Sequence, residues 1–106
     1  MLFSRKARLT RKSDFVQMFS EGIRKKSGPL LIYRRANECA HARLGLSVPK
    51  KVGNAVVRNR IKRRCREAFR IIQNELPSVD ILLTVRFHSP LPMEDYKKFI
   101  IDGITK

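Results

Sequence analysis

The sequence has few of the residues that cross-link a chain or anchor it in a membrane. Its 106 residues include two cysteines, five prolines, five glycines and no tryptophan. No apolar stretch approaches the roughly 18 residues of a transmembrane helix, and the N-terminal residues lack the apolar centre of a signal peptide. Cys39 and Cys65 form no Cys-x-x-Cys pair and have no histidines at metal-ligand spacing. We therefore expect a soluble, cytoplasmic protein with reduced thiols.

Acidic residues are also scarce. The chain has 24 lysines and arginines against 9 aspartates and glutamates, a formal net charge of +15. An apolar share of 42% is too high for a disordered tail, and we predict one domain over residues 1–106. Self-repulsion at this charge density opposes the compact state, which favours a polyanionic partner. Residues 1–70 hold 20 basic and 4 acidic residues, against 4 and 5 in residues 71–106, so the first two thirds should bind nucleic acid.

Groups suited to catalysis are few. A protein-only nuclease needs clustered carboxylates for metal ions or histidines for acid–base chemistry. Here the acids are scattered, and neither His41 nor His88 has a partner motif. We predict no catalytic residue and no metal ligand in this chain.

One loop is typical of a phosphate site. Residues 49–54 (PKKVGN) lead from a predicted strand into a predicted helix, so two lysines lie beside the free amides of a helix start. The Gly-Lys-Ser/Thr ending of a Walker loop is absent, which argues against nucleotide hydrolysis. An ordinary strand-to-helix turn capped by Asn54 explains Gly53 and Asn54 equally well.

Hydrophobic periodicity predicts an α+β fold. The predicted helices are residues 13–21, 55–76 and 93–104. The predicted strands are residues 29–35, 43–48 and 79–87. The first two strands should pair as antiparallel neighbours joined by residues 36–42. Ser13 should cap the first helix and Gly22 should end it in the left-handed conformation. In the last helix, Tyr96, Phe99, Ile100 and Ile104 should face the core.

The long helix over residues 55–76 has two chemically opposite faces, with Asn54 as its cap and Pro77 after its end. The core-facing residues are Val57, Ile61, Cys65, Ala68, Phe69, Ile72 and Leu76. The opposite arc holds Asn59, Arg60, Lys62, Arg63, Arg66 and Arg70, with Arg58 and Arg64 at its margins. Like charges four residues apart should destabilise the isolated helix by about 1–2 kcal/mol in total. A merely solvated face would mix charges to avoid this cost, so we assign this face to phosphate contact.

Three aromatic residues lie within the basic part of the chain. Phe15 and Phe19 are four residues apart on the first helix, and Tyr33 lies on a strand. Such rings can stack on unpaired bases. A phenylalanine pair at helical spacing is more typical of a core, so spacing alone leaves both interpretations open.

Residues 44–69, LGLSVPKKVGNAVVRNRIKRRCREAF, closely resemble the signature region of the protein subunit of bacterial ribonuclease P. The block RNRIKR at 58–63, preceded by KKVGN at 50–54, carries the resemblance, which extends from the first helix to Arg86. It implies the order α-β-β-β-α-β-α with a four-stranded sheet, similar to the second domain of the fifth small-subunit ribosomal protein and to domain four of elongation factor G. It also implies a left-handed β-α-β crossover, although chain topology in general favours the right-handed form.

The resemblance also implies a function. In that family a catalytic RNA holds the Mg²⁺ ions and removes the 5′ leader of precursor tRNA to give the mature 5′ end, while the protein binds that RNA and the single-stranded leader. The residues expected to meet the catalytic RNA are Arg58, Asn59, Arg60, Lys62, Arg63 and Arg66. Those expected to meet the leader are Phe15, Phe19, Tyr33, Lys50, Lys51, Asn54 and Arg86, and Arg58 and Asn59 are expected to line the same cleft. No membrane or DNA partner is expected.

The sequence departs from the family pattern at two places, and one alternative function stays open. Phe87 stands where the family commonly has a second basic residue, and the chain ends at Lys106, so we expect a short or truncated C-terminal helix. The alternative function is that of a ribosomal or general RNA-binding protein on the same fold, which would not prefer precursor over mature tRNA. A helix-based DNA reader fits less well, because the arginines of the long helix face many directions.

Overall fold

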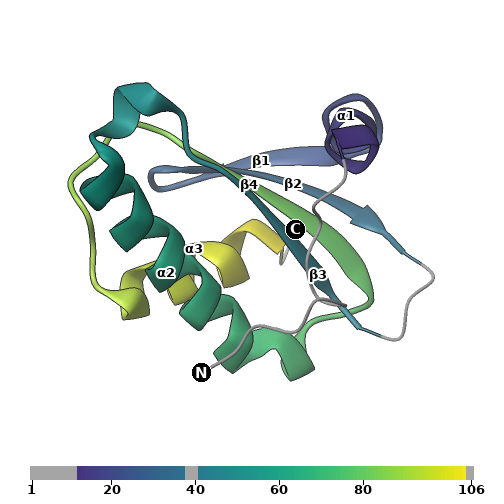
Figure 1. Cartoon of the computed structure of the whole chain (residues 1–106). Coiled ribbons are helices and arrows are strands. Elements are labelled where there is room, and N and C mark those ends of the chain that lie inside the picture. Colours follow the sequence, from purple (N-terminus) through teal and green to yellow (C-terminus); the bar gives the residue numbers. More distant parts are fainter. Residues whose placement is uncertain (1–11, 38–40, 105–106) are drawn as a thin grey trace.

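The computed structural model describes residues 12–37 and 41–104, so Cys39 lies outside the described residues. The helices and strands are α1 (Lys12–Glu21), β1 (Ile23–Ser27), β2 (Leu30–Ala36), β3 (Arg43–Ser47), α2 (Ala55–Ile72), β4 (Val79–Val85) and α3 (Met93–Ile104). Single 3₁₀ turns precede and follow α2, at Lys50–Val52 and Gln73–Glu75. Helices α2 and α3 cover one face of the sheet, and α1 lies against the other (Figure 1). The predicted α+β class and element order are confirmed.

The sheet has the strand order β1-β2-β4-β3. β2 is antiparallel to both β1 and β4, whereas β3 runs parallel to β4. The predicted pairing of β2 with β3 is therefore wrong, because β4 lies between them. β4 (VDILLTV) is mostly buried and takes a central position, where both of its edges are hydrogen-bonded. The path from β3 through α2 to β4 is the crossover that the resemblance implies, and its hand stays a prediction.

The edge strand β1 was absent from the periodicity-based prediction. Its sequence, IRKKS, has one apolar residue in five, and four of these residues lie at or near the surface. Lysines at an exposed sheet edge discourage pairing with other chains, which explains a strand of such low hydrophobicity. The two-residue turn Gly28–Pro29 joins β1 to β2, and Gly28 has a φ of +57°, as the first central residue of such a hairpin turn requires.

Three helix ends differ from the predictions. α1 begins at Lys12, so Ser13 lies within its first turn and does not precede it. Gly22 does not adopt a positive φ, because the chain passes directly from α1 into β1. α2 ends at Ile72, and the chain tightens into a 3₁₀ turn before Leu76, which is extended as expected for a residue before proline.

The main core lies between the sheet and the helices α2 and α3. The predicted inner stripe of α2 is confirmed, since Ile61, Cys65, Ala68, Phe69 and Ile72 are buried there, with Val57 and Leu76 packed at its margin. Burial raises the pKa of the Cys65 thiol to about 12, so this cysteine acts as a small apolar core residue. The inward residues of α3 are also confirmed: Tyr96, Ile100 and Ile104 are buried, and Phe99 packs against them.

A buried carboxylate joins the strands on the opposite face of the sheet. Asp80 of β4 is 0% exposed. Its Oδ1 accepts hydrogen bonds from Arg43 Nε and Asn37 Nδ2, both at 2.8 Å, and its Oδ2 accepts from Arg43 Nη2 at 2.8 Å and Arg35 Nη2 at 3.1 Å. Burial alone would raise the pKa of Asp80, but the hydrogen bonds from Arg43, Asn37 and Arg35 outweigh it and hold the pKa below its usual value.

The same arginine that contacts Asp80 also holds α1. Arg35 Nη1 donates to Gln17 Oε1 at 3.0 Å and lies 3.4 Å from Glu21 Oε1. On this face a smaller core, made of Met18, Tyr33 and Leu82 with Phe15 and Leu31 against it, packs α1 onto β2 and β4. α1 is therefore fixed to the sheet by one polar tether and one small apolar cluster.

We predict that Asp80→Asn lowers the free energy of unfolding by about 3 kcal/mol at neutral pH, because it leaves two partly buried arginines without their shared anion. The folded-state pKa of Asp80 lies below the unfolded one, so its contribution is present above the unfolded pKa and is lost as pH falls through the folded pKa. Urea unfolding at about pH 7 and about pH 2.5 should show that the difference in the free energy of unfolding between wild type and variant is smaller in acid. Asp102→Asn, at an exposed carboxylate, is the control. A gap of equal size at both pH values would contradict this role.

Candidate nucleic-acid interface

Among the described residues, one face of the sheet is covered only in part, by α1, and we call it the open face. Because directly opposed residues share a face, the strand registers place three rows of side chains there. The rows are Lys26–Leu31–Thr84–Ser47, Arg24–Tyr33–Leu82–Gly45 and Arg35–Asp80–Arg43. In the third row the side chains form ion pairs with one another, through Asp80. α1 packs over part of the second row, at Tyr33 and Leu82. The first row leads to the end of β4.

The three predicted aromatic residues meet on the open face. The rings of Phe19 and Tyr33 contact edge to face, with centroids 5.0 Å apart and an interplanar angle of 81°. Tyr33 is 9% exposed and Phe15 packs beside it in the small core, whereas Phe19 is 49% exposed. The core interpretation therefore applies to Phe15 and Tyr33, which support α1, whereas Phe19 presents a ring surface to solvent and its stacking on a base stays a prediction.

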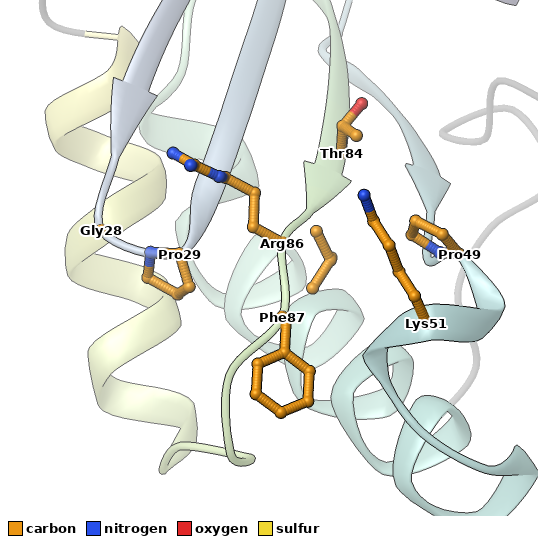
Figure 2. Close-up of a pocket in the computed structure, with 8 residues that line it drawn as sticks. Gly28, Pro29, Pro49, Lys51, Thr84, Arg86 and Phe87 are labelled. Atoms are coloured by element: carbon orange, nitrogen blue, oxygen red, sulfur yellow. The ribbon is translucent and has the colours of Figure 1, made fainter.

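A pocket of about 490 Å³ lies where β4 ends. It is lined by Gly28, Pro29, Pro49, Lys51, Thr84, Val85, Arg86 and Phe87. Figure 2 shows the side chain of Lys51 extending toward Thr84 on one side of the end of β4, while Arg86 extends on the other side, over the strands that meet at the Gly28–Pro29 turn, and the ring of Phe87 points the other way. The Thr84 hydroxyl is buried and has no hydrogen-bond partner among the described residues. Two cations at one pocket are suited to a phosphate group.

The predicted phosphate loop forms one wall of this pocket. Lys50 and Lys51 are exposed on the 3₁₀ turn before α2, and the buried side chain of Val52 anchors that turn. Asn54 is confirmed as the cap of α2, since its Oδ1 accepts from the Val57 amide at 2.9 Å. Arg58 Nε donates to the Gly53 carbonyl at 3.1 Å, so an arginine predicted to contact RNA also braces the loop. The expected contact of Asn54 with the leader stays a prediction.

The outer face of α2 is a second, separate basic surface. Asn59, Arg60, Arg63, Arg66 and Arg70 are exposed there, and Lys62 is half-buried beside them. Within the part of the chain that the structure describes, none of the ion pairs includes Arg60, Arg63 or Arg66. These guanidinium groups are therefore available for phosphate oxygens. The predicted phosphate loop, residues 49–54, which we call the lysine loop, connects this surface to the pocket.

Sequence reasoning missed two cations of the open face. Arg24 and Lys26 are exposed on β1, in the same rows as Tyr33 and Leu31. The alternation Arg24-x-Lys26 next to a glycine-proline turn is the only signal for them, and it becomes visible once residues 23–27 are recognised as an edge strand.

Residues 12–37 and 41–104 contain no group of three histidine, cysteine, aspartate or glutamate side chains placed to hold a metal ion. None of the helices in these ranges is long and apolar enough to span a bilayer. Asp80, the buried acid, already has its oxygens occupied by two arginines and an asparagine. The exposed arginines and lysines of α2 and of the pocket favour binding of an anionic polymer.

Comparison with known proteins gives a consistent result. The family model for ribonuclease P matches residues 3–100. The chain is 42% identical over 85 residues to the ribonuclease P protein component of Vibrio cholerae, covering 79% of this chain and 72% of that protein. It is 39% identical over 100 residues to the corresponding component of Aliivibrio salmonicida, covering 92% and 86%.

Solved structures agree. The RNase P protein of Staphylococcus aureus matches with a TM-score of 0.83 and 30% identity over 93% of both chains. The RNase P protein of Thermotoga maritima matches with a TM-score of 0.79 and 28% identity, covering 90% of this chain and 92% of that one.

We predict that replacing Arg60 and Arg63 together by alanine makes the binding of structured RNA less dependent on salt. Each lost phosphate contact should change the slope of log Kobs against log salt concentration by about 1, so the double variant should lose about 2. Filter binding across a salt series measures this slope, and urea unfolding checks that the fold is intact. A control variant, Lys97→Ala with Lys98→Ala on α3, should keep the wild-type slope. An unchanged slope in the α2 variant would exclude these arginines from the interface.

Proposed function

Because the chain belongs to the ribonuclease P protein family, we propose that it binds ribonuclease P RNA through the outer face of α2 and the single-stranded 5′ leader of precursor tRNA across the open face of the sheet. The chain is the protein subunit of the endoribonuclease ribonuclease P, and its partner is the ribonuclease P RNA. The observation that carries the proposal is the presence of two basic surfaces of different shape, which meet at the N-terminus of α2.

The open face suits a single strand. Phe19 offers a half-exposed ring for a base to stack on, and stacking tolerates any base, as binding to leaders of varied sequence requires. Lys50, Lys51 and Arg86 supply cations for the backbone phosphates along the same face. A double helix of RNA has no unstacked bases to offer to such a ring. These features support assignment of the predicted leader residues to this face.

The outer face of α2 suits a folded RNA. Its arginines have no internal acid partners in the described residues, and they project from a rigid helix that is packed against the core along its inner stripe. Arginine binds phosphate oxygens in a bidentate manner, which favours fixed contacts with an RNA backbone. We assign Arg60, Lys62, Arg63 and Arg66 to the ribonuclease P RNA, with Arg58 and Asn59 at the boundary with the leader surface.

We further propose that the RNA subunit holds the Mg²⁺ ions of the reaction. The acids of residues 12–37 and 41–104 form no cluster that fits a metal site, and none of the described residues takes a catalytic role in this proposal. The protein instead lowers the demand for Mg²⁺ by placing its own cations between RNA phosphates. A cytoplasmic location is proposed as well, supported by the free thiol of Cys65.

We predict that this protein stimulates cleavage of precursor tRNA by a bacterial ribonuclease P RNA at low Mg²⁺ concentration. The stimulation should shrink as Mg²⁺ is raised, because metal ions then neutralise the same phosphates. Gel assays of leader release, with RNA alone and protein alone as references, measure the effect. Cleavage by the protein alone would contradict the proposal. RNA binding with no stimulation, and with no preference for precursor over mature tRNA, would instead indicate a general RNA-binding protein.

We predict that Phe19→Ala weakens the binding of precursor tRNA by roughly 5- to 150-fold, the equivalent of about 1–3 kcal/mol of lost stacking. Binding of mature tRNA, which lacks the leader, should remain unchanged. Val16→Ala is the matched control, because Val16 is another exposed apolar residue of α1 and is absent from the small core. Equal losses for precursor and mature tRNA would show that Phe19 acts only by supporting the fold.

A further inference from the structure

The segment that follows β4 is held by an unbroken series of hydrogen bonds. The Arg86 amide donates to the Pro29 carbonyl at 2.9 Å, and the Arg86 carbonyl lies 2.8 Å from Nδ1 of His88. On the other side of the same imidazole, Nε2 lies 2.8 Å from the hydroxyl of Tyr96. Both polar groups of the Arg86 backbone are therefore fixed, while its side chain remains exposed at the pocket.

The series continues to α2. The Tyr96 hydroxyl accepts a hydrogen bond from the Leu91 amide at 3.1 Å, and the Leu91 carbonyl accepts one from Arg64 Nη1 at 2.8 Å. Arg64 lies at the margin of the basic face of α2, one turn after Arg60. A continuous path thus runs from the helix assigned to the ribonuclease P RNA to the backbone of Arg86.

The direction of each hydrogen bond follows from its chemistry. A carbonyl oxygen can only accept, so Nδ1 of His88 carries a proton and donates to Arg86. In the neutral imidazole Nε2 is then an acceptor, and it accepts a hydrogen bond from the Tyr96 hydroxyl. The Tyr96 oxygen keeps a lone pair for the Leu91 amide. Every donor has an acceptor, which fixes one tautomer of His88 and one orientation of its ring.

Tyr96 is the rigid centre of this series. Its side chain is 0% exposed in the main core, and its ring meets that of His88 edge to face with centroids 5.8 Å apart. Burial raises the pKa of Tyr96, so the hydroxyl stays protonated and can donate its hydrogen bond to His88. His88 is half-buried and connects this fixed point to the turn at the end of β4.

We propose that His88 and Tyr96 are positioning residues for Arg86, which hold the turn after β4 so that the Arg86 side chain faces the leader phosphate in the pocket. Arg64 ties the same turn to the helix that binds the ribonuclease P RNA. The proposal rests on the assignment of the pocket to the leader. In this proposal neither His88 nor Tyr96 contacts the leader, so both act on leader binding only through Arg86.

The test uses the reconstituted holoenzyme with precursor tRNA. Tyr96→Phe, which keeps the ring and removes the hydroxyl, and His88→Ala should each raise KM for precursor tRNA by about 3- to 10-fold, with kcat unchanged. Their affinity for the ribonuclease P RNA should stay within about twofold of wild type. His88→Asn keeps an amide donor near the position of Nδ1, and it should restore most of the wild-type KM. Equal rises in KM for His88→Asn and His88→Ala would overturn the proposal.

A double-mutant cycle separates this proposal from the assignment of the pocket. Arg86→Ala should raise KM, and adding His88→Ala to it should have no further effect, because both remove the same contact. If the two effects instead add, His88 acts elsewhere and the positioning role is wrong, although the pocket still binds the leader. If Arg86→Ala leaves KM unchanged, the assignment of Arg86 to the leader fails, and the positioning role fails with it.

A spectroscopic measurement tests the geometry without RNA. In nitrogen-15 spectra of the wild-type protein, His88 should show the neutral tautomer that carries its proton on Nδ1. In the Tyr96→Phe variant, the resonance of His88 Nε2 should shift, because Nε2 has lost its hydrogen-bond donor. A His88 ring protonated at Nε2 alone would overturn the proposal. Urea unfolding of each variant confirms that the changes in KM arise in folded protein.

Discussion

The buried carboxylate of Asp80 is the interaction on which this structure most depends. It lies on the central strand and accepts hydrogen bonds from side chains of β2, β3 and the loop after β2, so a single anion joins three segments. One of its partners, Arg35, also reaches Gln17 and Glu21 of α1. The position of α1, and hence of the half-exposed ring of Phe19, therefore depends on an acid in a chain that has very few acids.

The pocket at the end of β4 shows how distant parts of the sequence combine. Its walls come from the β1–β2 turn, the lysine loop before α2, and the residues that follow β4. The turn is possible because Gly28 adopts a positive φ, the loop is anchored by Val52, and the residues after β4 are held by His88 and Tyr96. Each cation of the pocket thus projects from backbone that is fixed by interactions outside the pocket.

Much of this arrangement could be predicted from the sequence, and the exceptions have physical causes. The inner stripe of α2 and the cap at Asn54 follow from helical periodicity and local hydrogen bonding, which depend on neighbouring residues. The strand order did not follow, because which strands pair is decided by burial of β4 between β2 and β3. β1 was missed because an edge strand needs little hydrophobicity. The clustering of Phe15, Phe19 and Tyr33 was expected from the family resemblance. The hydrogen bonds of Asp80 join residues 37 to 45 positions apart, and those of His88 lie in the irregular segment after β4, so neither set leaves a periodic pattern in the sequence.

The uneven distribution of charge along the chain has a kinetic consequence. Residues 1–70 carry a net charge of +16, whereas residues 71–106 carry −1, and the fold has a radius of gyration of only 12.6 Å. Part of this positive charge is also concentrated in space, because Arg60, Arg63, Arg66 and Arg70 are exposed together on the outer face of α2, and the field of a nearby RNA exerts a torque on such an asymmetric charge distribution. The protein is therefore turned with its basic side forward before the two molecules touch. A larger fraction of encounters then starts in an orientation that can proceed to assembly, and added salt reduces this advantage.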